Sequence, residues 1–384
     1  MPRTPNDRNL LNFSGGPGAL ADSVLQQVQA SIDSVPGVGL SILGISHRSK
    51  WFTDLVLDTE ERVRSLLGLS NEYHVLFLQG GATQQFSTVA MAFNTGTVHP
   101  AEYLGTGYWS GKSIEGATFN EMDDKPGRST LASNIKLAWS GRDSHYTQLP
   151  RNQELNLSKD APYFHYVSNE TVEGLQFKEV MGLDSVARIC DMSSDFLSAP
   201  VAADRYDLIY AHAQKNLGPA GVTIVVIKDS MLERIKPGLP PFLDYRTHVQ
   251  AHSNFNTPPV FAIYVVNLIT RWLMHEVGGL AQMEVINQQK AKILYDAIDE
   301  SHGMYLSSVN PYDRSPMNVT FKLPSQALEM EFLKRAESRG FSGLGGHRSV
   351  GGVRASLYNG VTIGATQRLA EFMGAFKSEF RSQF

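Results

Sequence analysis

Short apolar runs alternate with helical patterns over the first two thirds of the chain. The runs typical of buried strands cover residues 75–78, 163–167, 186–190, 208–211 and 222–227. The first is followed by Gly80-Gly81 and then by a helical pattern over residues 83–92. Short continuous apolar runs favour strands that are buried on both faces, and intervening helices connect such strands in parallel. The pattern predicts an α/β fold with a mostly parallel sheet covered by helices on both faces.

The last third of the chain has a different pattern. A helix should begin after Thr257-Pro258-Pro259, because a capping threonine and early prolines suit a helix start, and Gly278-Gly279 should end it. The elements expected beyond it are helices over residues 280–299, 327–339 and 366–380 and strands over residues 317–321 and 353–357. This is the pattern of a smaller C-terminal α+β domain.

The length of 384 residues exceeds the roughly 250–300 residues at which a single core stops growing. We therefore expect three parts: a segment 1–20 that packs with the small domain, a large domain 21–265 and a small domain 266–384. The charge sum of 34 basic and 38 acidic residues argues against a nucleic-acid partner. No apolar run approaches the roughly 20 residues of a membrane span.

Cysteine content and the N-terminus narrow the class of protein further. Cys190 is the only cysteine, which excludes an intrachain disulfide and a zinc site made of clustered thiolates, and we expect no metal. The N-terminus is polar and lacks the apolar segment of a secretory signal. The expected location is the cytoplasm.

Two titratable residues stand out from their surroundings. Lys215 lies among small residues and glycines between the strands at 208–211 and 222–227, where a partly desolvated amine can act as a nucleophile. Asp191 follows the strand at 186–190, and the carboxyl ends of parallel strands are where α/β sheets bind ligands. Taken singly, a surface lysine and a helix-capping aspartate are the commoner explanations.

Two further motifs lie between a strand and a helix. Gly80-Gly81-Ala82-Thr83 lets the backbone approach a ligand, and the free N–H groups of a helix start favour a phosphate, although a tight turn is an equal alternative. Trp109, in Gly107-Tyr108-Trp109, offers a face for a planar ring, although core packing is the default for tryptophan. One cofactor needs all four features together: pyridoxal 5′-phosphate, which takes a lysine, an acid at its ring nitrogen, a phosphate cradle and an aromatic face.

The sequence resembles the phosphoserine aminotransferase family, fold-type I pyridoxal-phosphate enzymes of the class V group. The blocks that carry the resemblance extend from residue 12 nearly to the C-terminus; they are Asn12-Phe-Ser-Gly-Gly-Pro17, Ser46-His-Arg48, residues 80–86, Gly107-Tyr-Trp109, Asn169-Glu-Thr171, residues 213–221, Phe255-Asn-Thr-Pro-Pro259, Met317-Asn-Val319 and residues 346–359. The resemblance implies a large domain with a seven-stranded type of sheet, a homodimer with shared active sites, and the exchange of an amino group between glutamate and phosphohydroxypyruvate, which yields phosphoserine in serine biosynthesis. It leaves open whether the chain also serves pyridoxine biosynthesis.

By position, the resemblance implies a role for each cofactor-binding residue. Lys215 would carry the cofactor as a Schiff base and move the substrate proton, Asp191 would pair with the ring nitrogen, and Trp109 would stack on the ring. The remaining cofactor contacts would come from Thr171 at the ring hydroxyl, from Ala82, Thr83 and Gln214 at the phosphate, and from Asn256 and Thr257 at the phosphate in the neighbouring subunit.

The substrates carry two anionic groups, which suit arginine. The resemblance implies that Arg354 takes the α-carboxylate, and that the pairs His47-Arg48 and His347-Arg348 take the distal phosphate or carboxylate, some of them across the dimer. Without the resemblance, two surface dipeptides explain these pairs equally well. Two departures touch this site: some members of the family have arginine in place of Thr83, and some have serine in place of Gly15.

Three functions other than a phosphoserine aminotransferase fit parts of this sequence. A cysteine desulfurase of the same fold needs an exposed cysteine, whereas Cys190 lies in an apolar run. A transaminase for small apolar 2-oxo acids would not need a second His-Arg pair. A non-catalytic ligand-binding relative would not need Lys215 together with Asp191.

Overall fold

A seven-stranded sheet with the strand order β1-β9-β8-β7-β4-β2-β3 forms the centre of the larger part of the molecule. The computed structural model describes residues 7–94, 96–118 and 134–380. The strands are β1 (Tyr73–Gln79), β2 (Ala101–Gly105), β3 (Ile135–Ser140), β4 (Phe164–Val167), β7 (Arg188–Asp191), β8 (Leu208–His212) and β9 (Val222–Lys228). Strand β9 runs in the direction opposite to the other strands of this sheet, so the predicted mostly parallel α/β sheet is confirmed. Strands β2 and β3 were not among the predicted runs.

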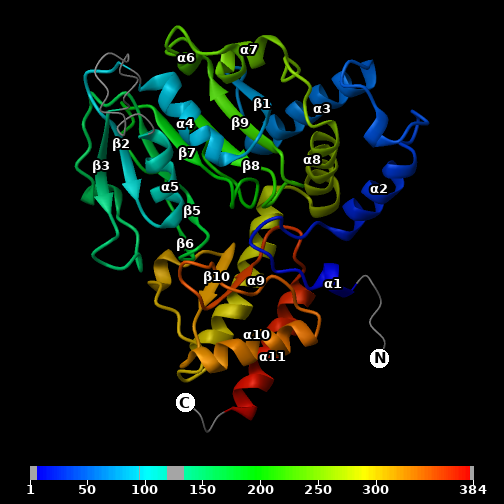
Figure 1. Cartoon of the computed structure of the whole chain (residues 1–384), viewed down its shortest axis with the longest axis vertical. Helices are drawn as coiled ribbons and strands as arrows, with labels where there is room; N and C mark the ends of the chain where they lie inside the picture. Colours follow the sequence, from blue (N-terminus) through cyan, green and yellow to red (C-terminus); the bar gives the residue numbers. More distant parts are fainter. Residues whose placement is uncertain (1–6, 95, 119–133, 381–384) are drawn as a thin grey trace, which may run out of the picture.

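Helices cover both faces of the sheet (Figure 1). One face carries α2 (Asp22–Asp33), α3 (Lys50–Leu67) and α8 (Val260–Trp272), and the other carries α4 (Ala82–Phe93), α5 (Tyr108–Ala117) and α7 (Tyr245–Gln250). Strand β1 shows why both faces of the sheet are covered. Its residues Val75 and Phe77 belong to the apolar core on one face, and Leu76 and Leu78 belong to the core on the other face. A strand that alternates between two apolar layers has no polar face, which explains its unbroken apolar run.

The helix predicted after Thr257-Pro258-Pro259 is α8, which continues as a π-helical turn, Leu273–Val277, up to Gly278. Within the described residues, Val260–Val277 is the one helical stretch whose length and composition would suit a membrane span. Of that stretch, 56% is buried inside the protein. Its apolar character is therefore accounted for by packing in the core of the large domain.

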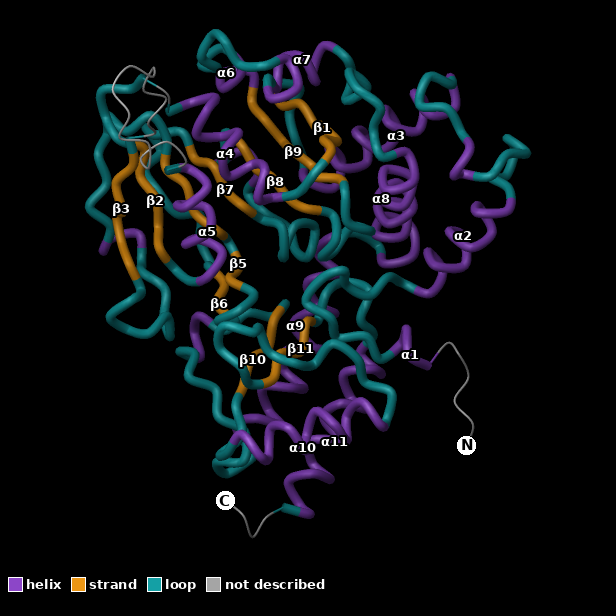
Figure 2. Tube along the Cα trace, viewed as in Figure 1, coloured by secondary structure: helices purple, strands orange, loops and turns teal. Residues whose placement is uncertain are grey.

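A second, smaller core lies below the sheet in Figure 2 and contains the antiparallel pair β10 (Asn318–Phe321) and β11 (Val353–Ser356). Helices α9 (Leu280–Asp299), α10 (Gln326–Ser338) and α11 (Ile363–Glu379) pack on it, as does the N-terminal stretch that follows α1 (Asp7–Leu10). The prediction of a smaller C-terminal part of α+β class is confirmed. The apolar core of the large sheet includes Met283 in α9, which lies beyond residue 265. The predicted domain boundary at 265 therefore stays a prediction.

The remaining described elements are short. They are the hairpin β5 (Asn169–Glu170) and β6 (Leu175–Gln176), helix α6 (Asp229–Leu232), and 3-10 turns at Ile42–Gly44, Asn152–Glu154, Ala203–Arg205, Pro241–Leu243 and Pro311–Asp313. The hairpin directly follows β4 and leads toward the small core.

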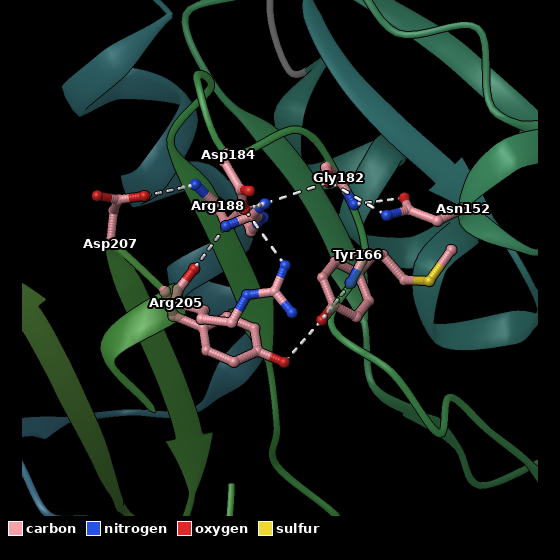
Figure 3. Close-up of polar contacts among 9 residues, drawn as sticks. Asn152, Tyr166, Gly182, Asp184, Arg188, Arg205 and Asp207 are labelled. Carbon is pink, nitrogen blue, oxygen red and sulfur yellow. Dashed lines mark hydrogen bonds and ion pairs between the residues drawn. The ribbon is translucent and has the colours of Figure 1, made fainter. Parts of the chain in front are cut away.

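A buried arginine anchors the start of β7, the strand that ends at Asp191 (Figure 3). The guanidinium of Arg188 donates hydrogen bonds to the carbonyls of Gly182 (3.2 Å) and Arg205 (3.1 Å) and pairs with the Asp184 carboxylate. Its backbone N–H donates to the Asp207 carboxylate at 2.8 Å. Loops on both sides of β7 are thereby tied to its first residue, which fixes where its last residue lies.

Candidate active site

The carboxyl ends of five strands meet at one edge of the large sheet. Gly81 follows β1, Trp109 follows β2, Thr171 follows β4, Asp191 ends β7 and Lys215 follows β8. A cavity of about 300 Å³ lies at this edge. Its lining consists of Gly81, Ala82, Thr83, Trp109, Val167, Asn169, Thr171, Asp191, Ser193, Ser194, His212, Gln214 and Lys215. Seven residues predicted to bind the cofactor within one chain therefore share one cavity.

Lys215 is buried, with 8% of its surface exposed, and its amine faces the cavity. The Nζ atom donates a hydrogen bond of 2.5 Å to the Gly15 carbonyl and lies 5.7 Å from the centre of the Trp109 ring. It forms no ion pair with any carboxylate among the described residues. An amine held by one carbonyl beside an open cavity is free to react with a carbonyl compound.

Asp191 is buried and lines the same cavity. Its Oδ1 atom accepts hydrogen bonds from the backbone N–H (2.8 Å) and the hydroxyl (2.5 Å) of Ser193. Its Oδ2 atom has no hydrogen-bond partner within the described part of the chain. Burial raises the pKa of the carboxyl to about 7. A carboxylate with one free oxygen in a dry site favours a cationic partner, such as a protonated ring nitrogen.

The first turn of α4 is open to an anion. Gly81 precedes the helix and supplies no side-chain cap, and the N–H groups of Ala82 and Thr83 have no acceptor among the described residues. Gly80 has φ +100°, which requires glycine, and a Cβ on Gly81 would lie 3.0 Å from the His212 ring. The two glycines thus keep the backbone close to the cavity, and the free N–H groups suit a phosphate.

The aromatic wall is held from two strand ends. The indole nitrogen of Trp109 donates to the Thr171 hydroxyl at 2.8 Å, and the backbone N–H of Trp109 donates to the Glu170 carboxylate at 2.9 Å. Because the side chain and backbone of Trp109 are both bound, its ring has a fixed orientation beside Lys215. The cavity, the amine, the free carboxylate oxygen, the open helix start and the aromatic wall together fit pyridoxal phosphate.

A second space of about 540 Å³ adjoins the first at Trp109, Gln214 and Lys215 and includes His347 and Arg354. The Nη1 atom of Arg354 donates to the Thr171 carbonyl at 3.4 Å, and its Nε atom is buried without a partner among the described residues. A Cβ on Gly15 would lie 2.3 Å from Arg354 Nη2, so the glycine provides room for the guanidinium. Arg348 is exposed and lines neither space.

Four predicted residues lie away from both spaces in this chain: His47, Arg48, Asn256 and Thr257. The side-chain amide of Asn254 donates to the His47 carbonyl at 2.9 Å, which places the two segments beside each other. The side-chain amide of Gln79 contacts the Thr257 carbonyl. These residues form a separate group at the surface, with Arg48 and Thr257 exposed.

Several lining residues were missed from the sequence. His212 ends β8, and burial lowers the pKa of its imidazole to about 4, so the ring is neutral near pH 7. Asn169, Ser193 and Ser194 are small polar residues just after strand ends, and that position was the available signal. Tyr358 lines neither space but was also missed; it follows β11, and its hydroxyl donates to the Gly15 carbonyl at 3.0 Å.

Comparison with known proteins agrees with the geometry. The aminotransferase class-V family matches residues 10–121 and 127–369. A phosphoserine aminotransferase of Geobacillus kaustophilus is 45% identical over 370 residues, which cover 96% of this chain and 98% of that protein. Among solved structures, a phosphoserine aminotransferase from Bacillus circulans subsp. alkalophilus has a TM-score of 0.90 at 42% identity, covering 96% of this chain and 98% of that one. A pyridoxal-phosphate-bound phosphoserine aminotransferase from Trichomonas vaginalis has a TM-score of 0.86 at 35% identity, covering 95% and 99%.

Proposed function

The chain belongs to the class-V aminotransferase family, and we propose that it acts as a phosphoserine aminotransferase that uses pyridoxal phosphate. The reaction would exchange an amino group between L-glutamate and 3-phosphohydroxypyruvate, giving 2-oxoglutarate and O-phospho-L-serine. The observation that carries the proposal is a buried lysine amine and a buried carboxylate with a free oxygen in one cavity.

Lys215 holds the cofactor and moves the proton. When bound, the cofactor supplies an electron sink for the negative charge that forms at the substrate Cα. The Lys215 amine would take the proton from the substrate Cα and return it in the course of the exchange, because it lines the cavity beside Trp109. The Gly15 carbonyl orients the amine before substrate binds.

The other residues of the cavity orient the ring. Asp191 would keep the ring nitrogen protonated, because its free oxygen lies at the cavity and its ionised form would pair with a cationic nitrogen. Trp109 would stack on the ring, and Thr171 would hydrogen-bond the ring hydroxyl. The N–H groups of Ala82 and Thr83 would bind the phosphate, and Gln214 would add a contact beside the lysine.

Cationic residues select the substrate. Arg354 binds the α-carboxylate, because its guanidinium borders the space in front of Lys215 and forms no ion pair with a carboxylate in the described chain. His347 lies at the same space, and Arg348 beside it reaches outward toward a distal phosphate or carboxylate. Thr83 supplies no cation there, so this chain binds the distal group without the arginine that some relatives have.

The site disfavours the desulfurase alternative. Cys190 is fully buried and lines neither of the two spaces, and burial raises the pKa of its thiol well above the usual range. Such a thiol is not a nucleophile for substrate sulfur. Transaminases of small apolar 2-oxo acids remain a second candidate, which the phosphorylated-substrate test below separates.

We propose that two copies of the chain share their active sites. His47, Arg48, Asn256 and Thr257 have the chemistry of an anion site yet lie away from Lys215 of their own chain. Exposed apolar residues flank them, namely Leu40, Leu43, Phe242 and Phe255. A second copy seated on this face would bury the apolar residues and bring the polar group to the partner's cavity.

A mixing experiment tests the shared site. Lys215→Ala and Thr257→Ala/Arg48→Ala proteins, each impaired alone, should regain about a quarter of normal activity after exchange of subunits in a 1:1 mixture, because half of the dimers are hybrids with one intact site. Light scattering should give twice the mass of 42.4 kDa. A monomer in solution, or no recovery on mixing, would refute the proposal.

The function itself is tested by absorbance. Purified protein should show the visible band of lysine-bound pyridoxal phosphate, and phosphoserine should convert it to the band of the amine form. Lys215→Ala should lack the band of the bound lysine and lose turnover. Conversion by alanine but not by phosphoserine would favour the transaminases of small apolar acids.

Two finer proposals rest on chemistry alone. 3-Hydroxy-2-oxo-4-phosphobutanoate carries the same two anionic groups as phosphohydroxypyruvate, and we propose it as a second substrate of the pyridoxine route; failure to transaminate it would remove this proposal. The single buried cysteine suits a reducing compartment, so we place the enzyme in the cytoplasm, to be tested by fractionation.

A further inference from the structure

Two glutamates lie side by side behind the wall of the active site. The Glu170 Cδ atom lies 2.8 Å from the position that a Cβ on Gly107 would take, and Glu173 Oε2 lies 2.5 Å from the same position. Glu170 is 1% exposed, and Glu173 Oε2 is buried. Two carboxylates in one dry site cannot both ionise easily, so one of them keeps its proton near neutral pH.

Hydrogen bonding decides which carboxyl is ionised. Glu170 accepts three hydrogen bonds at the start of α5: from the N–H groups of Trp109 (2.9 Å) and Ser110 (2.9 Å) and from the Thr106 hydroxyl (3.1 Å). Glu173 accepts one, from the N–H of Tyr108 (2.9 Å), and its Oε2 atom has no partner among the described residues. Three donors stabilise an anion better than one, so Glu170 is the charged member and Glu173 the neutral one.

Glu173 shares a cavity with the substrate-binding arginine. This cavity, of about 410 Å³, has Glu173, Arg354, His347, His145 and Lys322 in its lining, and it shares Arg354 and His347 with the space in front of Lys215. Burial and the charge of the Glu170 carboxylate raise the pKa of Glu173, and the charge of the Arg354 guanidinium lowers it.

We propose that Glu173 is a specificity residue that controls the charge around Arg354: in its neutral form it leaves the guanidinium available to the substrate carboxylate, and in its ionised form it competes with that carboxylate. The proposal rests on the function assigned to Arg354 above. A negative charge beside the guanidinium weakens binding even without movement, because it cancels part of the positive potential that a carboxylate meets.

The titration supports this arrangement. Burial, followed by the charge of Glu170, raises the pKa of Glu173 to about 8. Glu173 is therefore neutral at pH 7 and ionised at pH 9. Carboxylate binding should be strong at the lower pH and weaken as the pH rises through 8, a direction opposite to that expected of a carboxylate that helps binding.

Binding of glutarate to the holoenzyme tests the proposal. Glutarate carries two carboxylates and no amine, so it does not titrate between pH 7 and pH 9 and does not turn over. Calorimetry measures the dissociation constant of glutarate at pH 7 and at pH 9. Glu173→Gln imitates the neutral form of Glu173 at both pH values. Between pH 7 and pH 9 the dissociation constant should rise about tenfold more in the unmodified protein than in this variant. Any other group that titrates between these pH values is present in both proteins, so its contribution cancels in the comparison.

Controls separate the possible failures. Glu179→Gln removes an exposed carboxylate on the same connection and should behave like the unmodified protein. Equal pH dependence in Glu173→Gln and the unmodified protein, or loss of binding in Glu173→Gln already at pH 7, would overturn the proposal. If Glu173→Gln does not fold, Glu173→Ala also removes the charge and is judged by the same criteria. Absence of glutarate binding in every protein at pH 7 would instead refute the assignment of Arg354.

Discussion

The amine of Lys215 donates a 2.5 Å hydrogen bond to the carbonyl of Gly15, although 200 positions separate the two residues in sequence. Gly15 lies between Phe13 and Ala19, which belong to the small core, whereas Lys215 follows β8 of the large sheet. The hydroxyl of Tyr358 donates to the same carbonyl at 3.0 Å. The catalytic amine is therefore positioned where the two cores meet, and any shift between them would move it.

The hydrogen bond between Trp109 and Thr171 should contribute to cofactor affinity. Trp109→Phe keeps an aromatic ring but removes the indole N–H, and Thr171→Val removes the acceptor. Trp109→Phe should bind pyridoxal phosphate about fivefold more weakly, since a net hydrogen bond contributes about 1 kcal/mol, and Thr171→Val should lose more because its hydroxyl is also assigned to the ring hydroxyl. The affinities come from titration of the apoprotein by absorbance. The double variant should lose less than the sum of the two, and strict additivity would show that the bond contributes nothing.

Asp191 should make cofactor binding depend on pH. Its pKa of about 7 means that the carboxyl is neutral below pH 7 and charged above it. Pairing with a cationic ring nitrogen requires the charged form, so cofactor affinity should fall as the pH drops below 7, by up to about tenfold per pH unit. Asp191→Asn should lack this part of the dependence and lower kcat by about 10²-fold to 10³-fold. An unchanged pH profile in the variant would contradict the assignment.

The two arginines near the substrate should differ in what they recognise. Arg354→Lys should raise KM for phosphoserine and for glutamate alike, by about 10-fold to 100-fold, because both carry the same α-carboxylate and lose a charged hydrogen bond. Arg348→Ala should weaken phosphorylated substrates more than unphosphorylated analogues. Steady-state kinetics with both kinds of substrate distinguish these outcomes. Equal losses in Arg348→Ala would count against a distal phosphate site at this residue.

Arg188 should matter for stability rather than for chemistry. Its side chain is 5% exposed and donates to the carbonyls of Gly182 and Arg205. Arg188→Met should lower the free energy of unfolding by about 2–4 kcal/mol, because buried acceptors lose their donor. Asp184 is 85% exposed, so Asp184→Asn should cost less than about 1 kcal/mol. Denaturant unfolding of both holoenzymes measures the difference, and equal losses would show that the carbonyl contacts are unimportant.

Local sequence patterns determined the elements that form the site. The apolar run before Gly80-Gly81, the helix after it and helix α9 are all recognisable, because each has a regular pattern of buried apolar residues along its length. Strands β2 and β3 were missed for the opposite reason. Strand β2 contains the buried polar residue Glu102, and β3 lies at the sheet edge with exposed positions.

The sequence by itself determined which chemical groups are available: one lysine and one aspartate at strand ends, a glycine-rich helix start and a tryptophan, all consistent with one cofactor. Only the tertiary structure decided which groups face one another. It brought Gly15 to Lys215, placed Glu173 beside Glu170 and Arg354, and kept His47 and Asn256 away from the cavity of their own chain. Contacts between residues far apart in sequence depend on how the two cores pack, and no local pattern of apolar and polar residues encodes that packing.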